Sequence, residues 1–554
     1  MRVLCLALIG LSLVLAALWG ALRCIRSLHL LQLDSYSNLR LLKWLWFSPL
    51  ERLFDYRLGI VLLAVLAINS TLWRLGVPFG AYASLGGWMA AATLLFLRRR
   101  KPEAKKPLVY TGRAKRILSV AVVFCAVIGG VFFLLAAKQL ASEADARLAY
   151  KSVTTALIGG FLLAQLASLL VPLSNLMLVP IQSAINSKYV RSARRKLGDI
   201  SPVVIGVAGS YGKTSTKYIT ETLIAERFLV LKTPGSFNTL MGLCRVINGE
   251  LKPEHQVFIA EMGAYRRGDV RELTDLVRPR IGIITSIGPE HFERFKSMEN
   301  IKATNYELIE SLPGTGVAVF NNDIAECREL ADRTRAPRVV RYGLDRSQGN
   351  LSLSAEEIGM SAKGLEFTLV DDQGNRVKTH VSLLGRHNVL NVLGAACIAR
   401  EMGLSLEEIA RAIPKTKQVP HRLQLIQGTG GVSVIDDSYN SNPIGAIEAL
   451  GVLQEFNTGR RVLVTPGMVE LGELEAIENE RFGAAAAKVC DYVLLVGARQ
   501  TQPILRGLER ERFPSERLRV VKDLSEATSE LQKIVRAGDV VLFENDLPDL
   551  YTET

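Results

Sequence analysis

The chain has 554 residues, which predicts three or more domains, and its mean hydropathy of +0.20 is high for a soluble enzyme. Its net charge of +13 would suit a nucleic-acid-binding protein, but residues 1–200 hold 25 Lys and Arg against 7 Asp and Glu, which leaves −5 for residues 201–554. The basicity therefore belongs to an apolar amino-terminal part, and we expect no nucleic acid as a partner.

Five apolar runs occupy the first 180 residues, and each is close to the ~20 residues that a helix needs to cross a bilayer. The second run is the weakest because Asn69 and Arg74 interrupt it. A cleaved signal peptide is the alternative for the first run, but its basic start is only Arg2 and no small-residue cleavage site precedes Arg23. We therefore predict a transmembrane region of about five helices over 1–180, with spans at 3–22, 59–75, 79–97, 117–137 and 155–180.

Basic residues gather after the first, third and fifth runs, whereas the other loops carry few charges. The positive-inside rule then puts the amino terminus outside the cell and all residues after 180 in the cytoplasm. We predict a multi-pass protein of the plasma membrane, with membrane lipids as partners and cytoplasmic catalytic domains. For the basic linker 181–200 a solvated connector is favoured over a specific lipid site. The basic residues are Arg23, Arg26, Arg40, Lys43, Arg52 and Arg57, then Arg98, Arg99, Arg100, Lys101, Lys105, Lys106, Arg113, Lys115 and Arg116, then Lys188, Arg191, Arg194, Arg195 and Lys196.

From about Pro202 short β-branched runs alternate with helical patterns, which predicts α/β structure with parallel sheets covered on both faces. Residues 351–381 alternate more and contain turn residues, which predicts a hairpin insertion at a sheet edge. A helix ends near 414–421, and we place a boundary there between a central domain, 201–420, and a smaller Rossmann-like domain, 421–554. The expected strands are 203–207, 257–260, 281–286, 317–320, 432–435, 461–465, 492–496 and 540–543.

Seven cysteines are scattered along the chain without C-x-x-C spacing. This pattern is typical of a reducing cytosol and of helices in lipid, and it predicts core packing in place of a disulfide or metal-thiolate framework.

The segment GVAGSYGKTSTKYI, residues 206–219, joins a predicted strand to a predicted helix. Its glycines let backbone N–H groups point at phosphate oxygens, Lys213 neutralises phosphate charge, and Thr214 suits Mg²⁺. Val207 stands where the strict phosphate-loop pattern has glycine, and a tight strand-to-helix turn is the alternative. The Gly-Lys-Thr-Ser ending favours nucleotide binding by Gly209, Ser210, Tyr211, Gly212, Lys213, Thr214 and Ser215.

Two more strand ends carry polar residues. Glu261 follows an apolar strand, where a carboxylate that holds Mg²⁺ lies in such sheets, and His291 follows the next strand. Single histidines are usually structural, so the prediction for His291 depends on the cluster.

Seven segments in one order resemble the Mur ligase family over about residues 201–543. The resemblance implies an ATP-dependent acid:amino-acid ligase of cell-envelope or peptidoglycan-type biosynthesis, which forms ADP and phosphate. ATP phosphorylates a substrate carboxylate to an acyl phosphate, and an amine then attacks it. The segments are GSYGKTS, EMGAYRRGDVRELTDLVRP, ITSIGPEHFERFKSMENI, LLGRHNVLNVLGAA, HRLQLI, IDDSYNSNP and MVELGE.

The resemblance also implies roles for single residues. Thr214, Glu261 and His291 serve two Mg²⁺ ions, and Lys213 holds phosphate. From the other segments, Asn388 and Asn391 contact adenine, while Arg422 and Asp437 reach phosphate and ribose from the carboxyl-terminal domain. Helix capping is the alternative for HNVLN and an Asx-rich turn for DDSYN. The implied catalytic residues are Lys213, Glu261, His291 and Arg422.

Three features depart from the family. Asn305 stands where many relatives carry a carbamylated lysine, and asparagine cannot be carbamylated. Lys302, three residues earlier, is a candidate substitute if the segment is a helix, and a second metal held differently is the alternative. Glu307 matches the family's acid two places beyond Asn305.

The second departure is that the apolar runs stand where relatives have a domain for a UDP-linked substrate. A carboxylate acceptor that is membrane- or lipid-linked is therefore expected, with an amino acid or amine as co-substrate. The third is the ending VVLFENDLPDLY in place of a Lys-Gly-Ser segment. Its acidic edge suits an amine-bearing substrate, and a solvated tail is the alternative. The residues of this edge are Glu544, Asn545, Asp546 and Asp549.

Three other functions stay open beside the ligase. Poly-γ-glutamate-type amide polymer synthases are membrane-associated and use the same chemistry. A nucleotide-gated transporter is disfavoured because the apolar runs hold almost no ionisable residues. A non-catalytic ATP-binding scaffold for envelope enzymes has Asn305 and the altered ending as its motivation.

Overall fold

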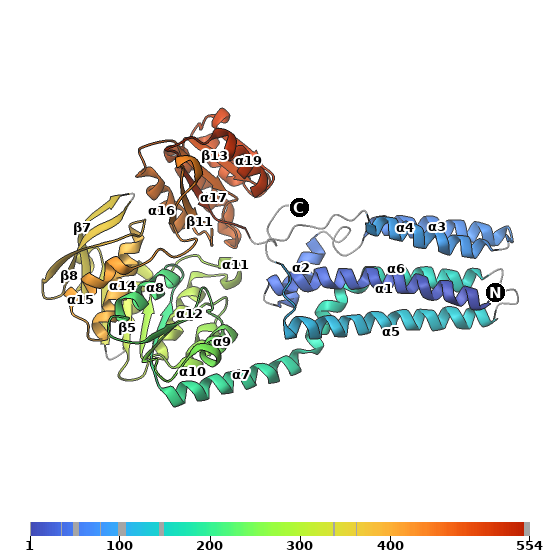
Figure 1. Ribbon diagram of the computed structural model, residues 1–554, viewed down its shortest axis with the longest axis horizontal. Helices are drawn as coiled ribbons and strands as arrows, with labels where there is room; N and C mark the ends of the chain where they lie inside the picture. The colour runs from blue at the N-terminus through green and yellow to red at the C-terminus, as the bar shows by residue number, and fades with distance from the viewer. Residues whose placement is uncertain are drawn as a thin grey trace. The chain divides into compact units, whose positions relative to one another are not determined.

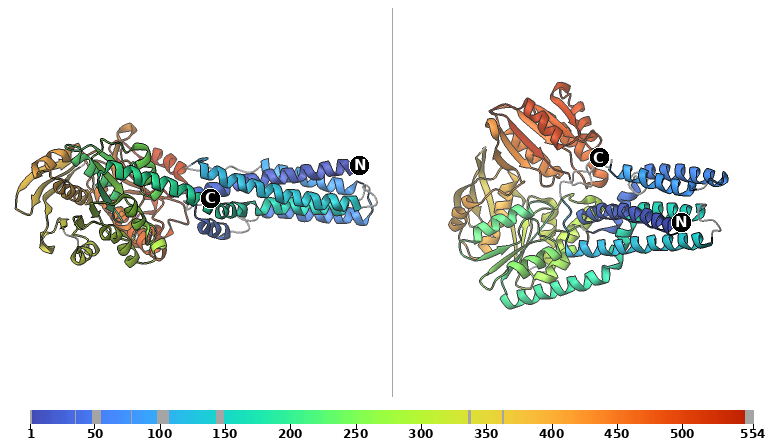
Figure 2. Two further views of the ribbon diagram at one scale, coloured as in Figure 1. Left: turned by 90° about the horizontal axis from the view of Figure 1, so that it is seen from below. Right: turned by 45° about the vertical axis from the view of Figure 1, so that its right-hand side comes forward.

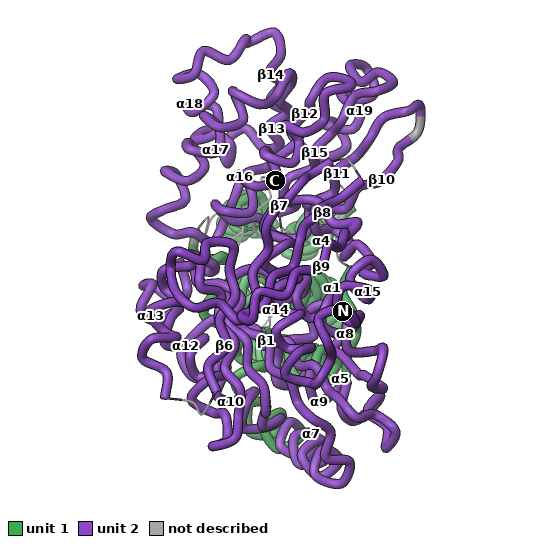
Figure 3. The backbone as a smooth tube through the Cα atoms, turned by 90° about the vertical axis from the view of Figure 1, so that its left-hand side faces the viewer, with its two compact units in different colours: residues 1–185 green, residues 186–554 purple. Residues whose placement is uncertain are grey.

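The computed structural model describes residues 2–34, 36–47, 55–77, 79–97, 107–142, 149–335, 338–361 and 363–547. Within it the chain forms two compact units, Met1–Ile185 and Asn186–Thr554 (Figure 3). The residues with a predicted role that lie outside the described residues are Arg52, Arg98, Arg99, Arg100, Lys101, Lys105, Lys106 and Asp549.

The first unit is helical, and α1, α5 and α6 lie side by side in it (Figures 1 and 2). Four of the described helices, α1, α3, α5 and α6, are long and apolar enough to cross a membrane. The third predicted run forms α4. The helices are α1 (Arg2–Leu33), α2 (Asn38–Phe47), α3 (Tyr56–Arg74), α4 (Gly80–Leu97), α5 (Gly112–Ser142) and α6 (Tyr150–Met177).

Polar side chains inside this unit bond to one another. Asn69, which weakened the prediction for α3, is buried and donates to the Thr154 hydroxyl of α6 at 3.0 Å. Arg23 is also buried and donates to Gln165 at 2.9 Å and to Ser168 at 3.2 Å. These bonds offset the cost of burying polar groups, and they let α1 continue past the predicted end at residue 22.

The predicted basic linker forms a helix, α7 (Val179–Ile200). Four apolar residues at helical spacing pack on the core of the second unit, while the basic residues face outward. The expectation of a solvated connector is therefore wrong for one face of α7, because the helix is amphipathic and its apolar face is packed on the core. The packed residues are Val190, Ala193, Leu197 and Ile200.

The central sheet of the second unit has nine strands in its described residues, in the order β2-β3-β1-β4-β5-β6-β7-β8-β9. The strands from β2 to β7 pair in parallel, which confirms the predicted mostly parallel sheet. The strands are β1 (Val203–Ala208), β2 (Val230–Lys232), β3 (Val257–Glu261), β4 (Ile281–Ile284), β5 (Val317–Asn321), β6 (Arg338–Gly343), β7 (Leu353–Ser361), β8 (Gly364–Asp371) and β9 (Arg376–Val381).

Helices cover both faces of this sheet. Successive residues of β1 enter opposite cores, with Ile205 and Val207 on one face and Val204 and Ala208 on the other. Burial on both faces explains why the strands are continuous apolar runs. One face is covered by α8 (Lys213–Ile224), α14 (His387–Glu401) and α15 (Leu406–Ala412), and the other by α7, α9 (Leu240–Glu250), α10 (Asp269–Val277), α12 (Met298–Glu310) and α13 (Ala325–Arg333).

The predicted hairpin at 351–381 is at the sheet edge as expected, but it has three strands, β7, β8 and β9. Asp371 makes the second turn by accepting hydrogen bonds from the N–H groups of Gln373 and Asn375, at 3.0 and 2.8 Å. The third strand was missed because its polar sequence, RVKTHV, carries little apolar signal.

A second sheet follows the predicted boundary (Figure 1, orange to red). Its order is β10-β11-β15-β12-β13-β14, parallel except for β10. Cysteines lie buried throughout the chain, as predicted. The elements of this part are β10 (Gln424–Gln427), β11 (Ser433–Asp437), α16 (Pro443–Gln454), β12 (Arg461–Thr465), α17 (Glu475–Val489), β13 (Tyr492–Val496), α18 (Gln502–Arg510), β14 (Leu518–Val521), α19 (Leu524–Ile534) and β15 (Val540–Glu544).

Candidate active site

The predicted phosphate loop joins β1 to α8, at the centre of the parallel sheet. In the sheet β3 lies on one side of β1 and β4 on the other, so the strand order reverses at β1. Such a reversal is where ligands bind in open α/β sheets. The structure thus brings together the strand ends that carry Lys213, Glu261 and His291.

Glycine is required at two positions of the loop. Gly209 and Gly212 have φ of 133° and 78°. A Cβ atom at Gly209 would collide with the Thr285 hydroxyl, and one at Gly212 with the amide oxygen of Asn391. The loop therefore fits closely between the β4 end and α14.

Replacing Gly212 with alanine is expected to lower the free energy of unfolding by about 1–3 kcal/mol and to weaken ATP binding, because it adds the collision to the left-handed backbone. Thermal unfolding and titration with a fluorescent ATP analogue measure both effects. Gly374→Ala is the matched control, since Gly374 has φ of 86° and no atom near its Cβ position. Equal losses in the two variants would show that the collision with Asn391 is unimportant.

The first turn of α8 offers hydrogen-bond donors. Among the described residues, no group accepts a hydrogen bond from the backbone N–H of Lys213, Thr214 or Ser215. Unpartnered N–H groups and the helix dipole make such a turn an anion site. The turn therefore fits the phosphates of a nucleotide.

Lys213 lies inside the loop in contact with a carboxylate. Its Nζ atom is 2.9 Å from Glu290 Oε2 and donates to the carbonyls of Gly209 and Ser210 at 2.6 and 2.7 Å. Burial, together with the negative charge of Glu290, raises the pKa of the adjacent Tyr211 hydroxyl well above its ordinary value. Sequence analysis missed Glu290, although it directly precedes His291.

Asn305 holds the loop from α12. Its Oδ1 atom accepts a hydrogen bond from the Gly209 N–H at 2.8 Å, and its Nδ2 atom donates to the Ile301 carbonyl at 2.9 Å. Both atoms are buried. A neutral amide therefore fixes the loop backbone at the position where many family members carry a carbamylated lysine.

Lys302 does not share this position. Its Nζ atom lies 3.0 Å from Glu329 of α13 and 3.7 Å from Glu299, so it points away from the loop. The suggestion that Lys302 replaces the carbamylated lysine is wrong, because its ammonium group is paired with carboxylates of α12 and α13. Glu307 instead accepts hydrogen bonds from the N–H groups of Gly268 and Arg271 at the start of α10.

Glu261 ends β3 beside Val207 of β1 and forms a buried ion pair. Its carboxylate is 2.8 Å from Lys217 Nζ, and the two side chains are 2% and 0% exposed. Asn238 donates to the other carboxylate oxygen at 3.2 Å, and Lys217 donates to the Gly235 carbonyl at 2.5 Å. Burial lowers the pKa of Lys217, and the charge of Glu261 opposes this shift. Sequence analysis missed Lys217, which lies one helical turn after Lys213.

His291 lies between two carboxylates. It is hydrogen-bonded through Nδ1 to Glu470, and its Nε2 atom is 3.9 Å from Glu290. Burial lowers the pKa of His291, but the hydrogen bond to Glu470 and the charges of Glu290 and Glu470 outweigh burial, so the pKa is raised. Glu470 belongs to the MVELGE segment, and the Glu293 N–H donates to its carbonyl at 3.1 Å. This segment therefore touches the central part of the unit beside His291.

The predicted adenine residues pack α14 against α8. Asn391 donates to Asn388 at 2.8 Å and accepts from the Thr216 hydroxyl at 3.3 Å, while Asn388 donates to the Leu384 carbonyl at 2.7 Å. Both are buried. The structure thus places Asn391 beside Gly212, and the adenine contact stays a prediction.

Arg422 and Asp437 lie near the start of the second sheet. The Arg422 guanidinium is 4.3 Å from the ring centroid of Tyr439, and Asp437 accepts a hydrogen bond from the Leu423 N–H at 3.1 Å. The Tyr439 hydroxyl is hydrogen-bonded to Ser236, in the segment between β2 and α9. Tyr439, another residue that sequence analysis missed, thus connects this group to the central sheet.

Glu544 is the register partner of Asp437 and is buried, with 1% of its surface exposed. The Ser441 hydroxyl donates to it at 2.6 Å. Burial and the negative charge of Asp437 raise the pKa of Glu544 well above its ordinary value, and burial also raises that of Asp437. The alternative of a solvated tail is therefore wrong for Glu544, whose side chain lies in the core.

The raised pKa of Glu544 makes stability depend on pH. The protonated form stabilises the fold fully below the ordinary pKa of 4.5, and this contribution is lost as pH rises through the raised pKa of the folded state. Glu544→Gln is expected to remove this loss and to raise the free energy of unfolding at pH 8 by about 1–3 kcal/mol. Urea unfolding at pH 5 and pH 8 measures it. Identical pH dependence in the variant and the wild type would contradict the raised pKa of Glu544.

Comparison with known proteins identifies the family. Residues 207–399 match the Mur ligase middle domain, and residues 421–544 match the Mur ligase, glutamate ligase domain. A UDP-N-acetylmuramoyl-tripeptide--D-alanyl-D-alanine ligase of Mycobacterium leprae is 31% identical over 366 residues, which are 62% of this chain and 70% of the relative. The chain belongs to the Mur ligase family. The resemblance inferred from the sequence motifs is confirmed, and it is to this ligase in particular.

Other Mur ligases agree with this assignment. The ligase of the same name from Escherichia coli (strain K12) is 32% identical over 53% of this chain, which spans 64% of that relative's length. The structure of the MurF ligase from Thermotoga maritima in complex with ADP is 26% identical, with a TM-score of 0.58 over 66% of this chain and 81% of that chain. A MurF structure from Acinetobacter baumannii, 24% identical, matches the fold with a TM-score of 0.59 over 66% of this chain and 78% of that chain.

Mur ligases are ATP-dependent amide ligases that form ADP and phosphate, and they use Mg²⁺. Among the described residues, no three His, Cys, Asp or Glu side chains gather into a group that could hold a metal alone. Mg²⁺ is usually held by one or two carboxylates together with substrate phosphates, so a single Glu261 beside the phosphate loop fits it. Thr214, in the first turn of α8, is buried next to this position.

Proposed function

We propose that this Mur ligase is a membrane-anchored enzyme of peptidoglycan-type envelope synthesis that joins an amine to the carboxylate of a membrane-linked acceptor. The observation that carries the proposal is the convergence of Lys213, Glu261 and His291 at neighbouring strand ends beside unpartnered N–H groups. Phosphoryl transfer needs chiefly positioning and neutralisation of charge, which these groups supply.

In the proposed reaction an oxygen of the acceptor carboxylate attacks the γ-phosphorus of ATP, and ADP leaves. The amine nitrogen then attacks the carbonyl carbon of the acyl phosphate, phosphate leaves, and the nitrogen loses a proton. Bound Mg²⁺ neutralises phosphate charge. Lys213 and the first turn of α8 orient the phosphates, and Asn305 keeps the loop in place.

The remaining predicted residues take supporting roles in this proposal. Glu261 and Thr214 hold Mg²⁺, with Lys217 fixing the carboxylate, and His291 serves a second ion. Arg422 and Asp437 reach the nucleotide from the carboxyl-terminal domain, residues 421–554. The other nucleotide contacts are Gly209, Ser210, Tyr211, Gly212, Ser215, Asn388 and Asn391.

Two features support the membrane part of the proposal. Four described helices have the length and composition of membrane spans, and their outward side chains include large apolar residues such as Val3, Leu63 and Leu134. Basic residues after the first, third and fifth runs favour a cytoplasmic position for 201–554. We therefore propose a lipid-linked acceptor for this chain, whereas the relatives are named for a UDP-linked tripeptide.

Turnover by the full chain in detergent micelles tests the proposal. The reaction holds ATP, Mg²⁺ and D-alanyl-D-alanine with either extracted lipid-linked envelope precursors or a UDP-linked muramoyl tripeptide, and phosphate and product masses are measured. We expect phosphate release that requires both amine and lipid-linked acceptor, and that is strongly reduced in Lys213→Ala.

The other outcomes decide between the alternatives. Equal release without an acceptor would contradict the ligase. Turnover with only the UDP-linked acceptor would support the ligase activity but contradict a membrane-linked substrate. A ladder of product masses would indicate a polymer synthase, and ATP binding without turnover would indicate a scaffold.

A further inference from the structure

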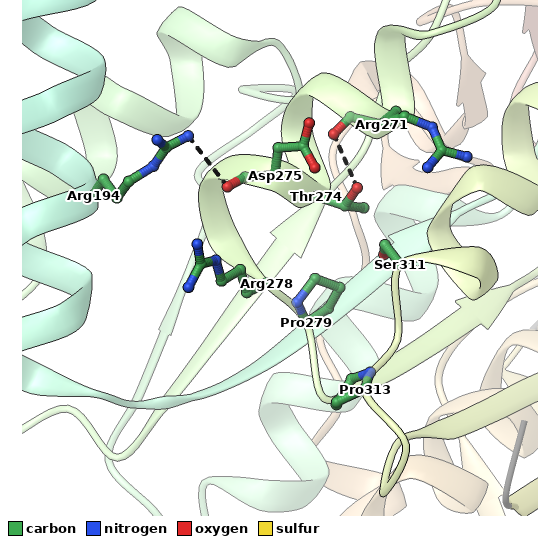
Figure 4. A pocket seen from close by; sticks show the side chains of 8 residues that line it. All are labelled: Arg194, Arg271, Thr274, Asp275, Arg278, Pro279, Ser311 and Pro313. Carbon is green, nitrogen blue, oxygen red and sulfur yellow. Dashed lines mark hydrogen bonds between the residues drawn. The ribbon is translucent and has the colours of Figure 1, made fainter.

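A hollow of about 560 Å³ lies at the opposite edge of the central sheet from the phosphate loop (Figure 4). Arg278 and Pro279, which line it, precede the amino end of β4, whereas the phosphate loop follows the carboxyl end of β1. Arg194 of α7 and Arg271 of α10 also line it. We call this hollow the arginine pocket, and its volume is within the range of small-molecule sites.

Two of its arginines have no carboxylate partner. Arg271 is paired with Glu310, but neither Arg194 nor Arg278 forms an ion pair with any described residue. Arg194 donates only to the backbone carbonyl of Asp275, at 3.4 Å. Figure 4 shows the guanidinium groups of Arg194 and Arg278 on the same side of the hollow. Three arginines and one aspartate, Asp275, line the hollow, so its charged lining is net positive and attracts an anion.

The backbone conformation of Arg278 determines which substitution tests this residue. This residue caps the carboxyl end of α10 in the left-handed conformation, with φ of 48° and ψ of 68°, and its N–H donates to the Thr274 carbonyl at 2.7 Å. Glycine is the usual residue there because a Cβ atom makes this conformation unfavourable. Replacing Arg278 with glycine therefore relieves backbone strain while it removes the guanidinium group.

We propose that the arginine pocket binds the phosphate group of an anionic ligand, with Arg194 and Arg278 as the donors. The planar fork of a guanidinium matches two phosphate oxygens, and Arg is the preferred residue for such recognition. The ligand is either the phosphodiester headgroup of an anionic phospholipid or free phosphate. A lipid is one of the two candidates because α7 directly follows α6, which is long and apolar enough to cross a membrane.

The strained backbone supplies a clean test. Arg278→Gly removes the guanidinium and relieves the left-handed strain, so its unfolding temperature is expected to equal or exceed that of the wild type. Arg194→Ala removes the second donor from an exposed site. Arg512→Gly is the matched control, because Arg512 also has a positive φ, of 59°, just after a helix, and lies outside the pocket.

Calorimetric titration of the full chain in neutral detergent, with inorganic phosphate and separately with short-chain phosphatidylglycerol, measures binding. We expect at least tenfold weaker binding of one or both ligands by Arg278→Gly and by Arg194→Ala, with Arg512→Gly unchanged. A loss confined to phosphatidylglycerol identifies a lipid site, and one confined to phosphate a free-phosphate site. Wild-type affinity in Arg278→Gly, or no binding by the wild type, would overturn the proposal.

Discussion

Lys213→Ala is expected to lower ATP-dependent phosphate release by about 10²–10³-fold, the usual effect of removing one group that stabilises charge in a transition state. In the structure Lys213 is the cation at the centre of the phosphate loop, in contact with Gly209, Ser210 and Glu290. No other lysine in the described residues contacts the loop carbonyls. Phosphate release by the full chain at saturating ATP is the measurement.

Lys302→Ala is the control for this prediction. Lys302 belongs to the same part of the chain, but its partners are Glu299 and Glu329, and exposed pairs contribute little to stability. We expect its turnover to match that of the wild type. Turnover retained in Lys213→Ala would contradict the assignment of the loop.

Lys217→Met is expected to destabilise the second unit by about 3–5 kcal/mol, because it leaves Glu261 as an uncompensated charge in the core. The pair is 2.8 Å apart and inaccessible to solvent. The double variant Lys217→Met, Glu261→Gln removes both charges and is expected to regain most of this loss. Urea unfolding of the two variants and the wild type measures it.

Activity separates the two roles of this pair. If Glu261 holds Mg²⁺, the double variant is stable and yet inactive. A double variant that is as unstable as Lys217→Met would show that the ion pair is not what the single substitution breaks. A stable double variant with full turnover would show that Glu261 has no role in the reaction.

Much of the fold follows from local sequence. Continuous apolar strands such as those of β1 and β3 indicated a buried parallel sheet, and the Gly-Lys-Thr ending fixed the place of the phosphate loop. β2, β6, β10 and β14 were not predicted, because they are short or carry charged and polar residues that resemble loops. The strand structure of β2, β6 and β14 depends on pairing with strands that lie 20 or more residues away, whereas β10 pairs with β11, the next strand along the chain.

The site could be predicted only in part for the same reason. Lys213 and Glu261 could be predicted because each comes at or shortly after the end of an apolar strand. The partner of Glu261 could not, because it is 44 residues away on α8. The contact between His291 and Glu470 spans 179 residues. The protonation of Glu544 depends on burial beside Asp437, which no spacing reveals. Lys302 was assigned to the wrong face because spacing alone does not give the direction of a side chain.

Glu290 has a consequence for the end of the reaction cycle. In the proposed reaction its carboxylate, 2.9 Å from Lys213 Nζ, and a phosphate group of the nucleotide compete for this ammonium group, because both are negatively charged. When phosphate departs, Glu290 is already within hydrogen-bond distance to replace it, so Lys213 never has to be left without a counter-charge. An internal competitor of this kind lowers the affinity for product and speeds its dissociation.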